Sequence, residues 1–496
     1  MSHLIPVVPH QCCSLSPSEL DSAKLTAERL RREKPELGVD PLFRNLVPHE
    51  IVDAPALHID DLTSIQNPDS SIILFQERAR LRAMDGDVLA TSLTPVEGYE
   101  SYCRDSLGMG CVVWVTPKPL NDPLELAGAC WEDRRVRREL VRRVRQDGLR
   151  YIHPHMGSKA AWELALLLSQ ASHRSVEVIG PPPSVTQFAN DKGEFSKLVT
   201  AMFGSGAIPA SAVVWNKATA AKRLKELDSF AQFIAVKLPS AAGGTGNVLI
   251  STSEIRDRTL QRIEEILDDR LRHLKYEVGD ELLVTQWVDN LIGSPSAQIW
   301  IPTRSQGLPI LEGLFMQNVS PGQGCFLGFG PAQLTDELKE TITRRCLQLA
   351  RVYQLLGYVG RCSLDMLLVG PNLQEAKMEF IECNGRWGGT SLPMTAMNRM
   401  FSDWRSRPFS ARTLKVDGLC QMTFPNLLRL LEGQLYQKKL NSGKFVLFNP
   451  RRTLVHSEVS VIALHQHWNS DDNAFENLEQ TILAALESSD GVISRA

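Results

Sequence analysis

Two acidic residues and an amide are spaced so that they can meet on neighbouring strands. The stretches 361–369 and 377–383 have strand composition, and the Gly-Pro-Asn run between them is typical of a turn. Alternate residues of a strand share a face, so an antiparallel hairpin would bring Asp365 close to Glu382 and Asn384. Carboxylate and amide oxygens are the protein ligands that Mg²⁺ prefers. This spacing predicts a magnesium site.

The surroundings of these carboxylates are expected to be apolar. Strict alternation along the second strand places Met378 and Phe380 on the same face as Glu382 and Asn384. A buried carboxylate is costly unless it is paired or bound to a metal. An ordinary hairpin with solvent-facing polar residues is the alternative, and the expected burial favours the metal site. Cys383 falls on the opposite face and is expected to pack in the core.

The run 382–386, Glu-Cys-Asn-Gly-Arg, resembles the E-x-N-x-R motif of ATP-grasp ligases, with Asp365 as the upstream acidic metal ligand. The resemblance implies an α/β protein with the ATP-grasp fold, in which two α+β subdomains grip ATP, preceded by a Rossmann-like pre-ATP-grasp domain. It implies ATP as cosubstrate and one or two Mg²⁺ ions, with Mn²⁺ possible, on Asp365, Glu382 and Asn384. Arg386, together with Arg361 on the neighbouring strand, would neutralise the developing oxyanion and the phosphate.

A second candidate region couples a strand lysine to a small-residue loop. Lys237 lies in the apolar strand 233–238, where a cation needs an anionic partner. The following loop, 239–247, can bring backbone N–H groups against phosphate because glycine permits close approach. No Gly-Lys-Ser/Thr follows, so this is not a P-loop, and a flexible hairpin loop is the alternative. The pair resembles the strand lysine and flap of ATP-grasp proteins, whose implied contacts are Ser240, Gly243, Gly244, Thr245 and Gly246.

The resemblance implies further nucleotide contacts. One lysine near a helix start would touch phosphate: Lys192 matches the local Asp-Lys pair and Lys197 fits the spacing to the following Gly-x-Pro turn better, so both remain candidates. The stretch 281–288 would be the hinge that holds adenine through its backbone. The residues implied for the base and the ribose are Gln286, Trp287, Val288 and Asp289.

Length and composition indicate a globular protein of several domains. The 496 residues are 43% hydrophobic and 22% charged, with a net charge of −3, which gives no general attraction to nucleic acid or anionic membranes. No membrane-length apolar run or leader-like N-terminus is evident, and the ten cysteines form no C-x-x-C pair, so a cytoplasmic protein with reduced thiols is expected. The expected parts are an arm (1–70), a pre-ATP-grasp domain (71–185), an ATP-grasp domain (186–400, with a lid at about 210–288) and an α/β appendage (401–496).

Strand and helix patterns alternate in the first half of the chain, which predicts a parallel sheet. The expected strands are 71–75, 111–115, 149–153 and 176–179, and the expected helices are 17–34, 122–146 and 159–170. Seven arginines in 134–145 allow RNA binding, but a solvated helix face is preferred because no aromatic platform accompanies them. His153-Pro154-His155 favours a structural or substrate contact over zinc. The glycine-rich stretch 322–330 is expected to be a loop beside the acceptor substrate.

These parts predict an ATP-dependent carboxylate–amine ligase. The resemblance implies a carboxylate that attacks the γ-phosphate to form an acyl phosphate, which an amine then displaces with release of ADP and phosphate. The motifs resemble most the pheganomycin-type peptide ligases, so the expected substrates are a small acid and an amino acid or peptide amine. The protein is expected to bind neither nucleic acid nor membrane and could form a homodimer. The alternatives are another ATP-grasp carboxylate-activating enzyme, such as a carboxylase or a kinase-like enzyme, and a non-catalytic nucleotide-binding regulator.

Overall fold

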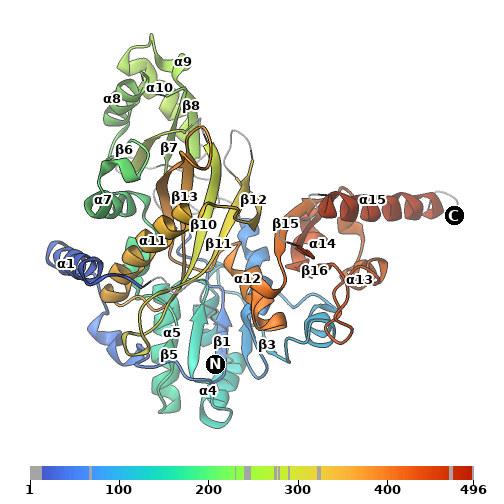
Figure 1. Cartoon of the computed structure of the whole chain (residues 1–496). Helices are drawn as coiled ribbons and strands as arrows, with labels where there is room; N and C mark the ends of the chain where they lie inside the picture. Colours follow the sequence, from blue (N-terminus) through green and yellow to red (C-terminus); the bar gives the residue numbers. More distant parts are fainter. Residues whose placement is uncertain are drawn as a thin grey trace.

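Three β-sheets follow one another in the computed structural model, with helices packed against each (Figure 1). The structure describes residues 14–65, 70–229, 231–238, 247–272, 276, 280–288, 291–320, 325–467 and 473–493. Within these ranges, no helix combines the length and the apolar character that crossing a bilayer requires.

The first sheet is parallel, as the alternation of patterns predicts. Its five strands lie in the order β3-β2-β1-β4-β5. Their bounds are β1 Ala56–Ile59, β2 Val88–Ala90, β3 Val113–Val115, β4 Tyr151–Pro154 and β5 Glu177–Val178. Helices α3 (Leu126–Glu132), α4 (Arg134–Gln146) and α5 (Lys159–Ser172) share one hydrophobic core with this sheet.

The start of this domain differs from the prediction. The stretch 71–75 is not a strand, because it belongs to the 3-10 helix η2 (Ser70–Arg82). The first strand is β1, which lies inside the predicted arm and is fully buried at the centre of the sheet. A short apolar run cannot be assigned to strand or buried helix from periodicity alone. Helix α1 (Pro17–Glu33) does begin as predicted, with a capping box between Ser16 and Glu19.

The predicted helix 122–146 is two helices, separated at Asp133. The carboxylate of Asp133 accepts hydrogen bonds from the backbone N–H groups of Arg135 and Val136, so a new helix begins there. Arg142 and Arg143 of α4 form ion pairs with Glu139 and Asp147, and Arg135 and Arg145 donate to backbone carbonyls. This arrangement agrees with a solvated helix face.

Replacing Asp133 by Ala is expected to lower the free energy of unfolding by about 1–2 kcal/mol, since the first-turn N–H groups of α4 lose their acceptor. Thermal or denaturant unfolding measures the change. Glu132→Ala is the matched control, because the neighbouring exposed carboxylate caps no helix. Equal losses in the two variants would contradict the capping role.

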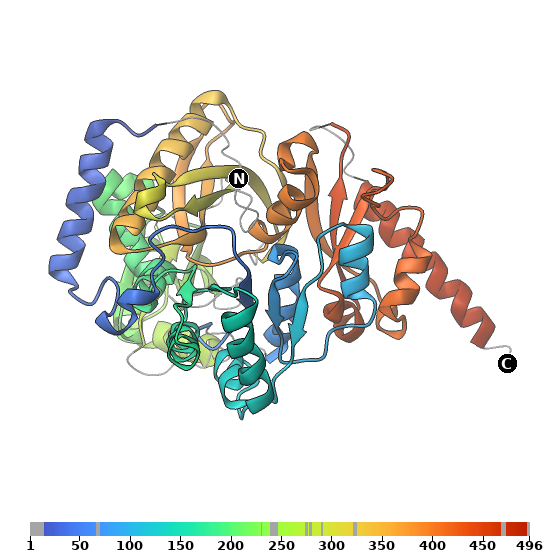
Figure 2. The ribbon, with the colours of Figure 1, turned by 90° about the horizontal axis from the view of Figure 1, so that it is seen from below.

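The second sheet is antiparallel and has eight strands in the order β14-β13-β10-β11-β12-β15-β17-β16. Their bounds are β10 Leu291–Ile301, β11 Ile310–Val319, β12 Phe326–Pro331, β13 Gly360–Val369, β14 Lys377–Asn384, β15 Phe409–Lys415, β16 Phe445–Phe448 and β17 Glu458–Leu464. The C-terminal strands therefore continue the central sheet, and the expected boundary at residue 400 falls within it. Helix α15 (Ala474–Ile493) extends away on the side opposite α1 (Figures 1 and 2).

Residues 326–330 of the glycine-rich stretch form strand β12 rather than a loop, and positions 321–324 lie outside the described residues. Gly328 pairs with Arg412 of β15, and a Cβ atom at Gly328 would lie 2.2 Å from the backbone oxygen of Ala411. Glycine is thus required here for close approach of two strands.

The third sheet, of four strands in the order β6-β9-β7-β8, lies at the top of Figure 1. Its strands are β6 Ser211–Val214, β7 Phe233–Lys237, β8 Asn247–Ser251 and β9 Leu282–Gln286, and its helices are α8 Lys217–Leu227, α9 Thr252–Ile255 and α10 Leu260–Leu271. The remaining main helices are α6 Pro183–Asn190, α7 Lys192–Phe203, α11 Asp336–Leu356, α12 Ser391–Phe401, α13 Phe424–Leu430 and α14 Pro450–His456. Strand β10 follows β9 in the chain and lies in the central sheet.

Candidate functional site

The predicted hairpin forms, and its register brings the three predicted metal ligands together. Strands β13 and β14 are antiparallel, with Asp365 opposite Glu382 and Ser363 opposite Asn384. The amide nitrogen of Asn384 donates to Asp365 Oδ2 at 2.8 Å. Two carboxylates and an amide oxygen therefore lie on one face of the central sheet.

A β-bulge at Ile381 corrects the predicted strand faces. The pairs Met366–Phe380 and Asp365–Glu382 leave Ile381 without an opposite residue. Phe380 and Met378 consequently lie in the core, and Glu382 lies on the other face, contrary to strict alternation. Bulges re-aim side chains in this way. Cys383 is buried, as predicted, and burial raises the pKa of its thiol.

The two carboxylates have opposite electrostatic environments. Burial raises the pKa of Asp365 to about 6, and the facing charge of Glu382 contributes. Burial also opposes ionisation of Glu382, but Lys192, Arg386 and Lys237 outweigh it and lower its pKa. Ser296 donates to Asp365 Oδ1 at 2.6 Å. The site therefore holds one carboxylate whose charge is poorly compensated and one surrounded by cations.

Ser296 is a site residue that the sequence prediction omits. It lies on β10, next to β13, and Gln298 donates to its hydroxyl at 2.9 Å. Ser294, Ser296 and Gln298 alternate with apolar residues along this strand. This alternation could have predicted a row of polar side chains on the strand beside Asp365.

The structure separates the two candidate lysines at the start of α7. Lys192 Nζ lies 3.1 Å from Glu382, and its side chain is 9% exposed. Lys197 instead pairs with Glu194 at 2.8 Å, and its side chain is 54% exposed. Lys192 therefore belongs to the site and Lys197 lies outside it. Helix α7 positions Lys192 because Asp191 caps its first turn.

Lys237 is the last residue of β7 in the four-stranded sheet, and its side chain interacts with the charges of Glu382 and Lys192. Burial lowers the pKa of Lys237 to about 8, and its electrostatic partners are Glu382 and Lys192. The predicted flap residues that follow it, Ser240, Gly243, Gly244, Thr245 and Gly246, lie outside the described residues, as does Asp289.

Arg386 follows the hairpin, two residues after β14 ends, and is held by a residue of α6. Its guanidinium donates to Asn190 Oδ1 at 2.6 Å, and the Gly385 backbone N–H donates to the same oxygen at 3.0 Å. Gly385 permits this contact because a Cβ atom there would lie 2.9 Å from Asn190 Nδ2. Asn190, the last residue of α6, thus positions Arg386, and the sequence prediction omitted it.

Arg361 is placed differently from the prediction. Its side chain is fully buried, forms an ion pair with Glu312 of β11 and lies between the rings of Trp300 and Trp387. Burial lowers its pKa to about 9. Its charge already has a buried carboxylate partner, so the geometry supports a structural role in joining β11, β13 and the segment after β14.

The predicted adenine-binding stretch lies at the end of β9. The backbone N–H of Gln286 donates to Ala210 and that of Trp287 donates to Phe233. These two N–H groups are therefore engaged within the sheet. The carbonyl oxygen of Gln286 accepts a hydrogen bond from the Thr285 hydroxyl at 3.4 Å, and Val288 ends this stretch.

The donor set fits a hard cation that takes its other ligands from phosphate and water. Within the described part of the chain, no group of three His, Cys, Asp or Glu side chains is placed to hold a metal. Asp365 and Glu382 face each other with repulsion that a divalent cation would relieve, and Mg²⁺ sites in phosphate-binding proteins commonly have only one or two carboxylates. His153 and His155 belong to no such metal group.

Comparisons with known proteins define the fold. No family model matches the chain, and no curated protein matches its sequence. Its structure is similar to N5-carboxyaminoimidazole ribonucleotide synthetase in complex with ADP, with 11% identity and a TM-score of 0.50 over 88% of this chain and 98% of that chain. It is also similar to the biotin carboxylase β,γ-ATP complex from Campylobacter jejuni, with 12% identity and a TM-score of 0.50 over 89% of this chain and 97% of that chain. The likeness shows an ATP-grasp fold behind a parallel-sheet domain, as predicted.

Proposed function

We propose that this chain binds ATP with Mg²⁺ and uses it to join a carboxylate to an amine. The observation that carries the proposal is the convergence of Lys192, Lys237 and Arg386 on the carboxylate of Glu382, directly across from Asp365. Three cations and two carboxylates from separate elements suit a metal-bound polyphosphate. The two similar structures, solved with ADP and with β,γ-ATP, support nucleotide binding.

Each residue has a role in the proposed reaction. Lys192 and Lys237 bind phosphate oxygens, and Asp365, Glu382 and Asn384 hold the cation, which neutralises charge on the phosphates. A substrate carboxylate oxygen attacks the γ-phosphorus, the bond to ADP breaks, and Arg386 stabilises the negative charge. The amine then attacks the acyl carbon of the acyl phosphate and phosphate leaves. No covalent enzyme intermediate is required.

The finer proposal is a peptide ligase of natural-product biosynthesis, acting in the cytoplasm on a small acid and an amino acid or peptide. It rests on the combination of the strand lysine and small-residue loop at 237–247 with the run 382–391. A first domain, an ATP-grasp domain whose central sheet the C-terminal strands continue, and a homodimer are proposed with it.

Purified protein incubated with ATP, Mg²⁺ and paired libraries of acids and amines tests the function. We expect ADP release that depends on both substrates and a product whose mass equals acid plus amine minus water. ADP release that needs bicarbonate and forms no amide would instead indicate carboxylation. Failure to bind or hydrolyse ATP under any pairing would favour a non-catalytic protein.

Nucleotide affinity is expected to fall as the pH rises from about 7.5 to about 9.5, by up to about tenfold per pH unit. Burial lowers the pKa of Lys237 to about 8 in the free protein, and a neighbouring phosphate favours the charged form. Binding therefore takes up a proton above this pH. Titration of the protein with Mg·ADP across this range measures the effect. Lys237→Arg keeps its charge, so a flat profile is expected, and equal slopes in both proteins would contradict the assignment.

A further inference from the structure

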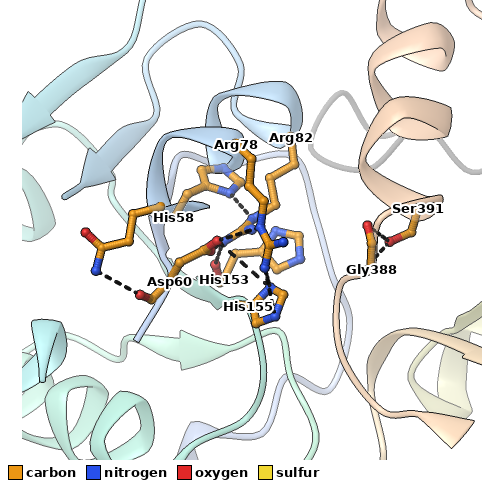
Figure 3. A network of polar contacts seen from close by, with 9 residues as sticks. His58, Asp60, Arg78, Arg82, His153, His155, Gly388 and Ser391 are labelled. Carbon is orange, nitrogen blue, oxygen red and sulfur yellow. Dashed lines mark hydrogen bonds and ion pairs between the residues drawn. The ribbon is translucent and has the colours of Figure 1, made fainter. Parts of the chain in front are cut away.

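A buried polar network lies at the carboxyl edge of the first sheet (Figure 3). Asp60 follows β1 and His155 follows β4, and these adjacent strands are where the strand order reverses. In open α/β sheets, ligands bind outside the carboxyl ends of strands at such a point. Arg78 and Arg82 reach the same place from η2.

Arg82 forms the inner part of this network. Its Nη2 donates to Asp60 Oδ1 at 2.6 Å and to the backbone oxygen of His153 at 3.1 Å, and its Nε donates to His58 Nδ1 at 3.2 Å. The side chain has 0% exposure. These contacts fix Arg82 as a structural residue that holds Asp60 in place.

Arg78 forms the outer part. Its Nη2 lies 3.2 Å from a ring nitrogen of His155, and its Nε lies 3.6 Å from Asp60 Oδ2, which is longer than a hydrogen bond. Among the described residues, Asp60 Oδ2 accepts no hydrogen bond. The Arg78 side chain is 16% exposed, and at 3.6 Å the carboxylate of Asp60 holds its guanidinium only loosely.

Within the described part of the chain, the guanidinium groups of Arg78 and Arg82 both face the single carboxylate of Asp60, so the positive charge is in excess there. Burial lowers the pKa values of His58, His153 and His155, so these histidines are neutral near pH 7. A buried cation in excess favours binding of an anion. A monoanionic carboxylate matches both the single charge and the planar donor pair of a guanidinium.

This network adjoins the phosphate side of the candidate site. The backbone N–H of Trp387 donates to the backbone oxygen of His155 at 2.9 Å, which ties the segment after β14 to the end of β4. Arg386 is close enough to affect the titration of both Arg78 and His155. An anion held by Arg78 would therefore lie beside the residue that is proposed to face the transferred phosphate.

We propose that Arg78 binds the carboxylate of an organic acid substrate, so that the first domain, and not only the hairpin, selects carboxylate-bearing substrates. This inference rests on the proposed function, because it identifies the substrate side of the same site. Arg78 is here a binding residue, and Arg82 keeps the network around it in place.

Direct binding measurements with the full chain saturated with Mg·ADP test this proposal. The probes are the twenty proteinogenic amino acids, their carboxamides and inorganic phosphate, observed by ligand-detected NMR. We expect one or more free acids to bind at least about tenfold more tightly than the matching carboxamides. Equal binding of acids and carboxamides, or no binding by any acid, would overturn the proposal. Binding of phosphate alone would also overturn it.

Arg78→Met should abolish the preference for free acids and leave Mg·ADP affinity unchanged. The matched control is Arg452→Met, because the guanidinium groups of Arg78 and Arg452 lie 5.1 and 4.5 Å from the same Phe75 ring, while Arg452 pairs with Glu458 outside the network. Thermal unfolding of both variants separates folding defects from binding, and Arg78→Lys should restore part of the preference. A preference that survives in Arg78→Met would refute the proposal. If the unaltered protein does not bind Mg·ADP, the proposed function is refuted instead.

Discussion

Replacing Glu382 by Gln is expected to reduce ATP turnover by at least about a hundredfold, since loss of one preorganised electrostatic group at a phosphate site typically costs this much. Glu382 lies opposite Asp365 and interacts with Lys192, Lys237 and Arg386. The substitution removes a proposed metal ligand and the charge that these cations share. ADP release and the Mg²⁺ concentration for half-maximal activity are the quantities to measure.

Glu379→Gln is the matched control for this variant. Glu379 lies on the same strand and pairs with Leu367, on the face that also carries Asp365 and Glu382, but no cation of the site contributes to its titration. It should retain turnover and Mg²⁺ dependence. If both variants lost activity equally, the effect would reflect the stability of β14, and the assignment of Glu382 to the metal site would fail.

The hairpin itself could be predicted because its determinants are local. A Gly-Pro-Asn turn between two apolar stretches predicts the antiparallel pairing of β13 with β14, which brings Asp365 near Glu382. The bulge at Ile381 was not predictable from alternation, because it depends on which side chains the core accepts. Phe380 packs against Phe195 and Phe203 from α7, far away in the sequence.

The polar network of the first domain shows the same limit. His153 and His155 are close together in the sequence, but Asp60 lies in the predicted arm (1–70) and Arg78 and Arg82 follow the predicted strand 71–75. A 3-10 helix in place of the predicted strand brings both arginines to the sheet edge. Tertiary packing therefore determines where Arg78 and Arg82 lie, which the local sequence pattern could not predict.

The packing of Arg361 supports a structural role instead of the catalytic role that the motif implied. The resemblance to ATP-grasp ligases implied a catalytic role for Arg361, on the strand that carries Asp365. Glu312, its partner, lies on another strand within an apolar run, where sequence gives no indication of a pair. Both side chains have 0% exposure, so the charge of each residue offsets the cost of burying the charge of the other.

Arg361→Met is accordingly expected to lower the free energy of unfolding by about 3–5 kcal/mol, because it leaves the Glu312 carboxylate buried without a partner. Glu312→Leu should be similarly destabilising, since it leaves the Arg361 guanidinium buried between Trp300 and Trp387 without a carboxylate partner. The double variant should recover much of the loss, because no uncompensated charge remains. Denaturant unfolding of the four proteins gives the coupling energy. A catalytic Arg361 would produce the opposite pattern: Arg361→Met would fold normally and lose turnover, while Glu312→Leu would remain active.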